Sequence, residues 1–469
     1  MSFSTPASAS SPEYGPGLSS RGSVVTAPGF RWGTTASSVS AEGAAPRADW
    51  SAWESTGRAA PSHDGAGLRV ESRDDIAQFV ALGCTDWRLA VEWARVEPEP
   101  GRIDPDALDW YHDVLAEARA AGLATWVTIH HGSLPGWYVD DEGGHRDETA
   151  RARWWAPHVD RLAEALDGVT DGWVPVDDPI GWAVRGYMLG TRPPGRRDLG
   201  QAHEALFGAV MATEEAVRLL ASGSQPVMTA WRADPLHPAP LDDGRITPEA
   251  QAATRRWDDL LWGTWLRAHA EGTLAVEGRA PTPVPALQAD VAIVGLIHDH
   301  PLGVDSGGSL GAWPAGASRA ADGFAPEPDE LAEVVNRVST ELPDSDIAIA
   351  GHGLPTTDDR WRDEVLDRSL GHVLEAAAEK RLVAYFHDSG IDGYEWTLGF
   401  DGPRGLLDRS RRPKPSSDRF RAATQATHHS KFLGSSPRDG DDPRNLGELG
   451  EGRGFSEPGT DPASPRHPC

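Results

Sequence analysis

Residues 173–179 read Trp-Val-Pro-Val-Asp-Asp-Pro, a short β-type run that ends in two adjacent carboxylates. Pro179 ends the predicted strand, because proline has no N–H to contribute to a β-ladder. Enzymes built on parallel barrels carry their polar, ionisable residues where the buried strands stop. Asp177 and Asp178 are therefore the first candidates for a functional site, at the mouth of a barrel.

The same pattern recurs along the chain, where short β-type runs alternate with amphipathic helical runs such as 104–121 and 360–380. This alternation is typical of parallel βα units. The predicted strands are Phe30–Ser38, Thr85–Trp93, Ala124–His131, Gly172–Asp178, Pro226–Trp231, Asp290–His298, Ile347–Gly351 and Val383–Asp388. Eight such units in one continuous stretch predict an α/β fold, a (β/α)8 TIM barrel.

The two ends of the chain differ from the part between them. Residues 1–28 and 426–469 hold few large apolar residues and many Ser, Pro, Gly and Asp. We therefore expect a disordered tail at 1–28, a barrel domain at 29–425 and a disordered acidic tail at 426–469. The Pro- and Gly-rich segment His300–Pro328 predicts a long loop after the sixth strand, on the functional side of the barrel.

Composition excludes several classes of partner. The formal net charge of −27 argues against nucleic acid and against anionic membrane surfaces. No run approaches the ~20 apolar residues of a membrane helix. Cys84 and Cys469 are the only cysteines, and the first residues lack the pattern of a secretory signal. We expect a cytoplasmic protein, and the oligomeric state stays open.

Five separated segments, in the right order, resemble glycoside hydrolase family 1, the retaining β-glucosidase family. They are Phe30–Ser38 with Glu42-Gly43, Trp87–Arg95, Thr128–His131 with Leu134-Pro135, Trp173–Pro179 with Gly186-Tyr187, and Tyr385–Leu406 with its Tyr394-Glu395-Trp396. The resemblance implies a TIM barrel that takes a small-molecule β-glucoside or related sugar and needs no cofactor.

At the two catalytic positions of that family, this chain carries different residues. Retaining glycosidases use two carboxyl groups ~5–5.5 Å apart, one as acid/base and one as nucleophile. By the resemblance the acid/base position falls on Asp178 and the nucleophile position on Gly351, which has no nucleophilic atom. We expect retaining hydrolysis to be lost or much reduced. Alternation along the second strand puts Glu92 on the same side as Arg88, so Glu92 is a candidate relocated catalytic partner for Asp178.

The resemblance also implies a sugar-binding set. Its members are Arg88, His131, Asp177, His298, Glu395 and Trp396. Glu395 would accept hydrogen bonds from hydroxyls, Trp396 would stack on the ring and His131 would donate to a hydroxyl. The alternative interpretation is structural, with Arg88 paired to a carboxylate in the barrel centre and His131 a hydrogen-bonded core residue.

Two other functions stay open. The first is a non-catalytic sugar-binding or scaffold barrel. The second is a repurposed, metal-assisted enzyme, because imidazoles and carboxylates at strand ends also form the ligand sets of Zn, Fe and Mn. Its candidate ligands are His131, His298, His352 and Asp388.

Overall fold

The computed structural model describes residues 29–433, and eight parallel strands form its centre. They are β1 (Arg31–Ala36), β2 (Asp86–Ala90), β3 (Ala124–His130), β4 (Gly172–Val176), β5 (Met228–Arg232), β9 (Ile293–Ile297), β12 (Asp346–His352) and β13 (Ala384–His387). Their order in the sheet is β4-β3-β2-β1-β13-β12-β9-β5. Bridges from Trp173 to Val227 and from Asp177 to Ala230 join β4 to β5 and close the barrel.

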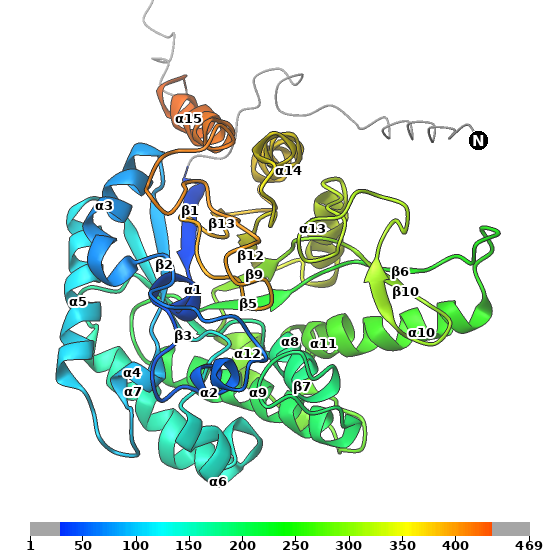
Figure 1. Ribbon diagram of the computed structural model, residues 1–469, viewed down its shortest axis with the longest axis horizontal. Coiled ribbons are helices and arrows are strands. Elements are labelled where there is room, and N and C mark those ends of the chain that lie inside the picture. Colours follow the sequence, from blue (N-terminus) through cyan, green and yellow to red (C-terminus); the bar gives the residue numbers. More distant parts are fainter. Residues whose placement is uncertain (1–28, 434–469) are drawn as a thin grey trace, which may run out of the picture.

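Helices surround the strands on the outside of the barrel (Figure 1). They are α1 (Ser38–Glu42), α2 (Asp49–Ser55), α3 (Leu68–Ala81), α4 (Trp93–Val96), α5 (Pro105–Ala120), α6 (Glu148–Ala150), α7 (Ala156–Ala165), α8 (Pro179–Ala183), α9 (Leu199–Leu220), α10 (Pro248–Asp258), α11 (Thr264–Glu271), α12 (Pro285–Ala289), α13 (Glu330–Glu341), α14 (Asp359–Ala378) and α15 (Ser417–Leu433). Among residues 29–433, none of these helices combines the length and apolar character that crossing a membrane requires.

Smaller elements decorate the mouth and one side. Short strands β6 (Leu236–Pro238), β10 (Leu302–Val304) and β11 (Leu310–Ala312) form a separate sheet, and β7 (Thr273–Leu274) pairs with β8 (Thr282–Pro283). In Figure 1, β6 and β10 lie with α10 in the extension at the right of the barrel. The helical turn η5 (Val184–Met188), which follows α8 directly, leads into a loop at residues 189–198.

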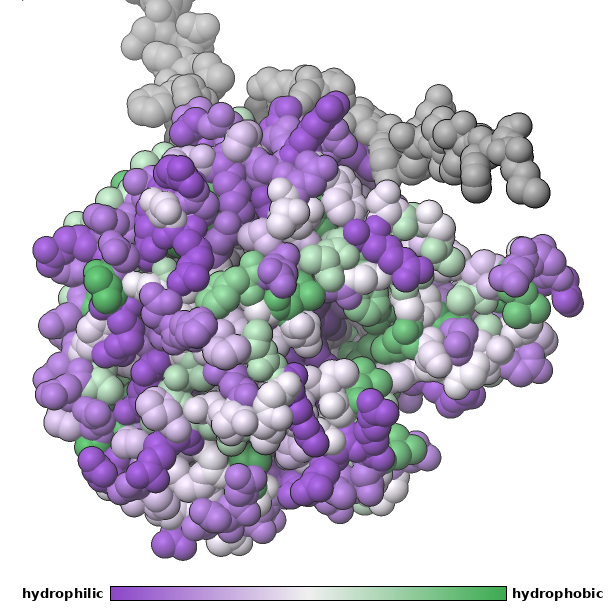
Figure 2. Space-filling view, viewed as in Figure 1, coloured by the Kyte–Doolittle hydropathy of each residue, from purple (hydrophilic) through white to green (hydrophobic). Residues whose placement is uncertain are grey.

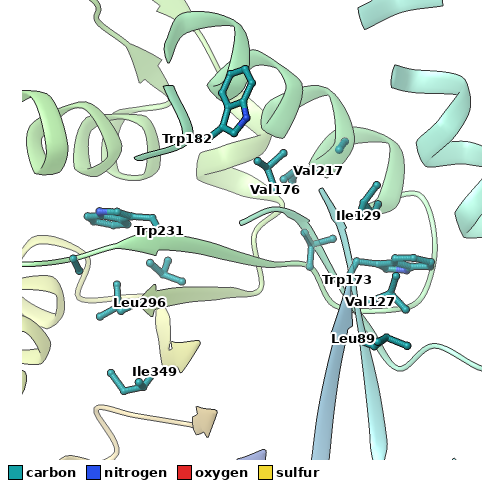
Figure 3. Packing of buried hydrophobic residues seen from close by; sticks show 14 of the residues in the cluster. Leu89, Val127, Ile129, Trp173, Val176, Trp182, Val217, Trp231, Leu296 and Ile349 are labelled. Atoms are coloured by element: carbon teal, nitrogen blue, oxygen red, sulfur yellow. The ribbon is translucent and has the colours of Figure 1, made fainter. Parts of the chain in front are cut away.

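Alternation of side chains along the strands creates two apolar layers. Inside the barrel lie Trp126, Val174, Met228, Ala230, Ile293, Ile297, Ala348, Ala350, Ala384 and Phe386. The neighbouring strand residues point outward to the helices, as Figure 3 shows for Val127, Trp173 and Ile349. Burial on both faces explains why the strands are nearly continuous apolar runs.

The structure confirms the fold predicted from the sequence. Each of the eight predicted strands overlaps one observed strand, with ends that differ by a few residues, and α5 and α14 fill the two predicted helical runs. Asp104 and Asp358 cap these two helices through backbone N–H groups of the first turn.

Two expectations need correction. The segment 300–328 is not a plain loop, because β10 and β11 lie in it and β10 pairs with β6. The predicted boundary at 425 falls inside a helix, because α15 runs from Ser417 to Leu433, and the division into a domain and tails stays a prediction. The expected tails at 1–28 and beyond 433 lie outside the described residues.

Candidate functional site

A polar cavity opens where the barrel strands end. Its walls are formed by Ser37, Ser40, Arg88, His131, Asp177, Asp178, Arg185, Arg192, Arg232, Ile297, Asp299, Asp322, Gly351, Asp388, Tyr394, Glu395, Trp396, Thr397, Leu398 and Arg404. Figure 2 shows a hydrophilic hollow near the centre of the face seen in Figure 1. Of the residues predicted from the sequence, Arg88, His131, Asp177, Asp178, Gly351, Asp388, Glu395 and Trp396 line this cavity, whereas Glu92, His298 and His352 do not.

Glu92 is buried behind the barrel wall and caps a helix. Its carboxylate accepts hydrogen bonds from the backbone N–H of Ala94, at 3.3 Å, and from the hydroxyl of Ser133, at 3.1 Å. β2 ends at Ala90, so strand alternation no longer sets the direction of Glu92. Glu92 is the N-cap of α4, a position that favours a carboxylate for structural reasons. The prediction that it faces Asp178 as a catalytic partner is wrong.

His298 and His352 point away from the cavity, because their neighbours Ile297 and Gly351 take the positions that face it. The His298 ring lies 3.7 Å from a carboxylate oxygen of Asp234, and His352 Nδ1 lies 2.8 Å from the hydroxyl of Tyr385. The sugar-binding role predicted for His298 is therefore not supported by its place. Within residues 29–433 no group of three or more His, Cys, Asp and Glu side chains is arranged to hold a metal ion, so the structure does not support the alternative in which His131, His298, His352 and Asp388 bind a metal.

Arg88, Asp177 and His131 form one ion-paired group at the ends of β2, β3 and β4. Arg88 Nη2 lies 2.5 Å from Asp177 Oδ2, and His131 Nε2 lies 3.6 Å from Asp177 Oδ1. Burial lowers the pKa of His131, against the opposite effect of Asp177. The structural interpretation of Arg88 as the partner of a central carboxylate is thus borne out, and all three residues still reach the cavity.

Asp178 is fixed in its ionised form. Its backbone is left-handed, with φ 48°, and its carboxylate accepts a hydrogen bond from Gly181 N at 3.1 Å, which caps α8. Arg185 Nη2 lies 2.7 Å and Arg232 Nε 3.5 Å from Asp178 Oδ2. Burial raises the pKa of Asp178, but the two guanidinium groups outweigh burial and lower it to about 2. A general acid must hold a proton near the working pH, which this environment opposes.

The arginines extend the pairing across the whole mouth. Arg232 Nη1 and Arg404 Nη1 lie 2.9 Å and 3.1 Å from the same oxygen of Asp299, and Arg404 Nε lies 3.1 Å from Glu395 Oε2. Together with the Arg185–Asp178–Arg232 contacts, these form what we call the mouth ion-pair chain: Arg185, Asp178, Arg232, Asp299, Arg404 and Glu395. Sequence reasoning did not predict the chain, although Arg232 ends β5 and the strand-end rule could have found it.

Glu395, the last member of that chain, differs from Asp178 in its charge. Burial raises the pKa of Glu395 to about 8, because the nearby Asp388 and Asp299 carboxylates add to the effect and Arg404 only partly offsets it. At neutral pH Glu395 is therefore mostly a neutral acid, which can donate as well as accept a hydrogen bond.

Trp396 already has neighbours on its ring. The guanidinium of Arg192 lies over it, 4.7 Å from the ring centroid. His131 stacks parallel to it with centroids 5.9 Å apart, and Trp50 meets it edge-on at 4.6 Å. A sugar that used Trp396 as a platform would have to share the ring with Arg192.

Gly351 and Gly353, two residues apart at the end of β12, have different surroundings. The register of β12 shifts against both neighbouring strands here, a bulge-like irregularity of the kind found near functional sites. A Cβ at Gly351 would meet only Ile297, at 3.5 Å, and Asp388, at 3.8 Å, whereas a Cβ at Gly353 would lie 1.9 Å from the carbonyl oxygen of Asp388. Gly351 therefore has room for a side chain, and Gly353 has none.

This contrast predicts opposite outcomes for two matched substitutions. Gly351→Ala should change the free energy of unfolding by about 1 kcal/mol or less, because its backbone is not left-handed and the space is open. Gly353→Ala should destabilise by about 3 kcal/mol or more, the upper range for overpacking, since a backbone atom must move. Denaturant unfolding of both variants measures the difference, and equal values would contradict the open space at Gly351.

Comparison with known proteins identifies the family to which this chain is related. The family model described as Glycosyl hydrolase family 1 matches residues 26–278. Beta-glucosidase A of Thermotoga maritima is 27% identical over 202 residues, which are 41% of this chain and 45% of that protein, so the aligned part spans under half of that relative. Thermostable beta-glucosidase B of Thermobispora bispora is 26% identical over 428 residues, 81% of this chain and 85% of that protein. The structure of a β-glycosidase from Pyrococcus horikoshii superposes with a TM-score of 0.77 at 23% identity, covering 88% of this chain and 99% of that one.

Proposed function

Because the chain belongs to glycosyl hydrolase family 1, we propose that it is a β-glucosidase-like member that binds a glycoside at the barrel mouth and has lost most or all retaining hydrolysis. One observation carries the proposal. The two positions that by resemblance to the family need free carboxyl groups hold Gly351, which has no side chain, and Asp178, which two arginines keep ionised. Neither a covalent glycosyl intermediate nor protonation of the leaving group is available from these positions.

The lining of the cavity supports retained binding. Asp177 and Glu395 offer oxygens to sugar hydroxyls, and His131 lies beside them. The cavity volume of about 110 Å³ is of the order of the ~150 Å³ that accommodates one benzene ring. A single six-membered sugar ring therefore matches the cavity better than a disaccharide does.

A second candidate function is a slow hydrolase with relocated groups. Asp388 faces the open space at Gly351, and its Cβ is 3.8 Å from where a Gly351 Cβ would lie. Its Oδ1 accepts a hydrogen bond from the hydroxyl of Thr35 at 2.6 Å. In this alternative Asp388 would attack the anomeric carbon, and protonated Glu395 would give its proton to the departing oxygen.

Binding and turnover, measured separately on the full chain, test the proposal. We expect saturable binding of methyl β-glucoside by titration calorimetry. We also expect hydrolysis of nitrophenyl β-glucoside at least about 10³-fold below the ~1–10³ s⁻¹ of ordinary enzymes. Turnover in that ordinary range would refute the loss of hydrolysis. Measurable slow turnover that disappears in Asp388→Asn would instead favour the second candidate.

A further inference from the structure

Arg192 stands apart from the other arginines of the cavity. It comes from the loop at residues 189–198, and its guanidinium lies over the Trp396 ring, 4.7 Å from the centroid. Among the described residues no carboxylate forms an ion pair with it, and its buried Nε has no hydrogen-bond partner. A cation that lines a cavity without a counter-charge is costly unless a ligand supplies one.

The neighbours of Arg192 increase that cost. Its pKa is lowered well below the ordinary arginine value by burial and then by the positive charges of Arg185 and Arg232. Unpartnered nitrogen atoms remain on the cavity arginines beside it, namely Nε of Arg185 and Nη1 of Arg88, whose side chain is only 5% exposed. The donors needed to receive an oxyanion are thus present, and no protein group uses them.

The carboxylates of the cavity are largely committed elsewhere. Asp177 is paired with Arg88 at 2.5 Å, and Asp178 with Arg185 at 2.7 Å. Asp299 joins Arg232 and Arg404, so each of the four other arginines already has an acidic partner. Of the five arginines that line the cavity, Arg192 is the one without an acidic partner among the described residues, so it can pair with the anionic group of a ligand.

We propose that the ligand of this cavity carries a carboxylate, which Arg192 binds with help from Arg185, so that the site takes a hexuronide in preference to a neutral hexoside. This inference rests on the proposed glycoside-binding function. The planar fork of a guanidinium matches a carboxylate with two parallel hydrogen bonds. A phosphate ester, with nearly two charges, would meet stronger repulsion from Asp178, Asp299 and Asp388, which line the same cavity.

Three matched probes test the inference on the full chain by titration calorimetry. Methyl β-glucoside and methyl β-glucuronide differ only at C6, which carries a hydroxymethyl group or a carboxylate, and methyl β-glucoside 6-phosphate adds the dianion. We expect the glucuronide to bind about tenfold or more tightly than the glucoside, the effect of one charge-assisted contact. Equal affinities, or tightest binding of the phosphate, overturn the carboxylate assignment and leave glycoside binding standing. Saturable binding of none of the three refutes the proposed function itself.

Substitution of Arg192 tests whether this residue causes the preference for the glucuronide over the glucoside. Arg192→Gln should reduce the ratio of glucuronide affinity to glucoside affinity by about tenfold. Arg197→Gln, at an exposed arginine near the end of the same loop, should leave both affinities unchanged. A folded Arg192→Gln protein that keeps its preference for the glucuronide contradicts the proposal.

Discussion

The Gly351→Glu variant is expected to hydrolyse dinitrophenyl β-glucoside about 10³-fold faster than the parent, a conservative share of the ~10⁶-fold that loss of a nucleophile costs a hydrolase. The substitution returns a carboxylate to the end of β12, where a new Cβ would meet only Ile297 and Asp388 at ordinary contact distances. A dinitrophenolate leaves without being protonated, so the ionised state of Asp178 does not limit the test.

The Gly351→Ala variant is the matched control, since it adds the Cβ without the carboxylate. Activity should appear with the Glu substitution only. The nearby Asp388 carboxylate would raise the pKa of the new glutamate, so adding Asp388→Asn should shift the acidic limb of the pH–rate profile to lower pH. A folded Gly351→Glu protein no faster than Gly351→Ala would mean that a glucoside does not reach this end of the cavity.

The second large effect is a loss of stability in mild acid. Burial lowers the pKa of His130 and His387 to about 3 and of His269 and His352 to about 4, against an ordinary value of 6.5. Above pH 6.5 these rings are neutral in both states. As the pH falls from 6.5 toward 4, the unfolded chain binds protons that the folded protein cannot bind, so the free energy of unfolding falls.

Two buried acids act in the opposite direction. Burial raises the pKa of Asp49 and of Glu395 to about 8, so the folded protein keeps protons that the unfolded chain releases above about pH 4. They lower stability as the pH rises from 4 to 8, and maximal stability is expected near pH 6.5. The four histidines outnumber the two acids, so these six groups together predict a loss of about 2.5 kcal/mol between pH 6.5 and pH 5.

Denaturant unfolding across pH 4–8 measures this dependence. His158 offers a further check, because it stacks on Trp93 with ring centroids 4.4 Å apart and neither ring nitrogen has a hydrogen-bond partner. His158→Phe should reduce the proton uptake on unfolding by about one below pH 6.5. Stability that is flat from pH 6.5 to 5 would contradict the assignment of neutral buried histidines.

The sequence predicted those features that depend on local periodicity. Apolar β-type runs followed by polar residues located all eight strands, and the strand-end rule placed Asp177, Asp178 and Gly351 at the cavity. The same rule failed at Glu92, which turns to cap α4, and at His298, because its neighbour Ile297 takes the position that faces the cavity.

The arginines of the site could not be predicted in this way. Arg192 and Arg404 reach the cavity from loops, and only the tertiary path of those loops brings them to Trp396 and Glu395. Nothing in their immediate sequence marks them, since the chain is rich in arginine throughout. The ionised state of Asp178 depends on Arg185, seven residues further along the chain, and on Arg232 at the end of β5, and the sequence alone assigned neither contact.

The acids of the mouth ion-pair chain also differ in how much the stability of the fold depends on each of them. Arg232 contacts Asp178 and Asp299, and Arg404 contacts Asp299 and Glu395, so each keeps an acid when one is removed. Among the described residues Arg185 has an ion pair with Asp178 alone, so removing Asp178 leaves Arg185 without a counter-charge. Breaking one partner of such a buried pair costs roughly 3–5 kcal/mol. Asp178 is therefore held at the mouth by what it contributes to folding, whatever its role at the anomeric carbon.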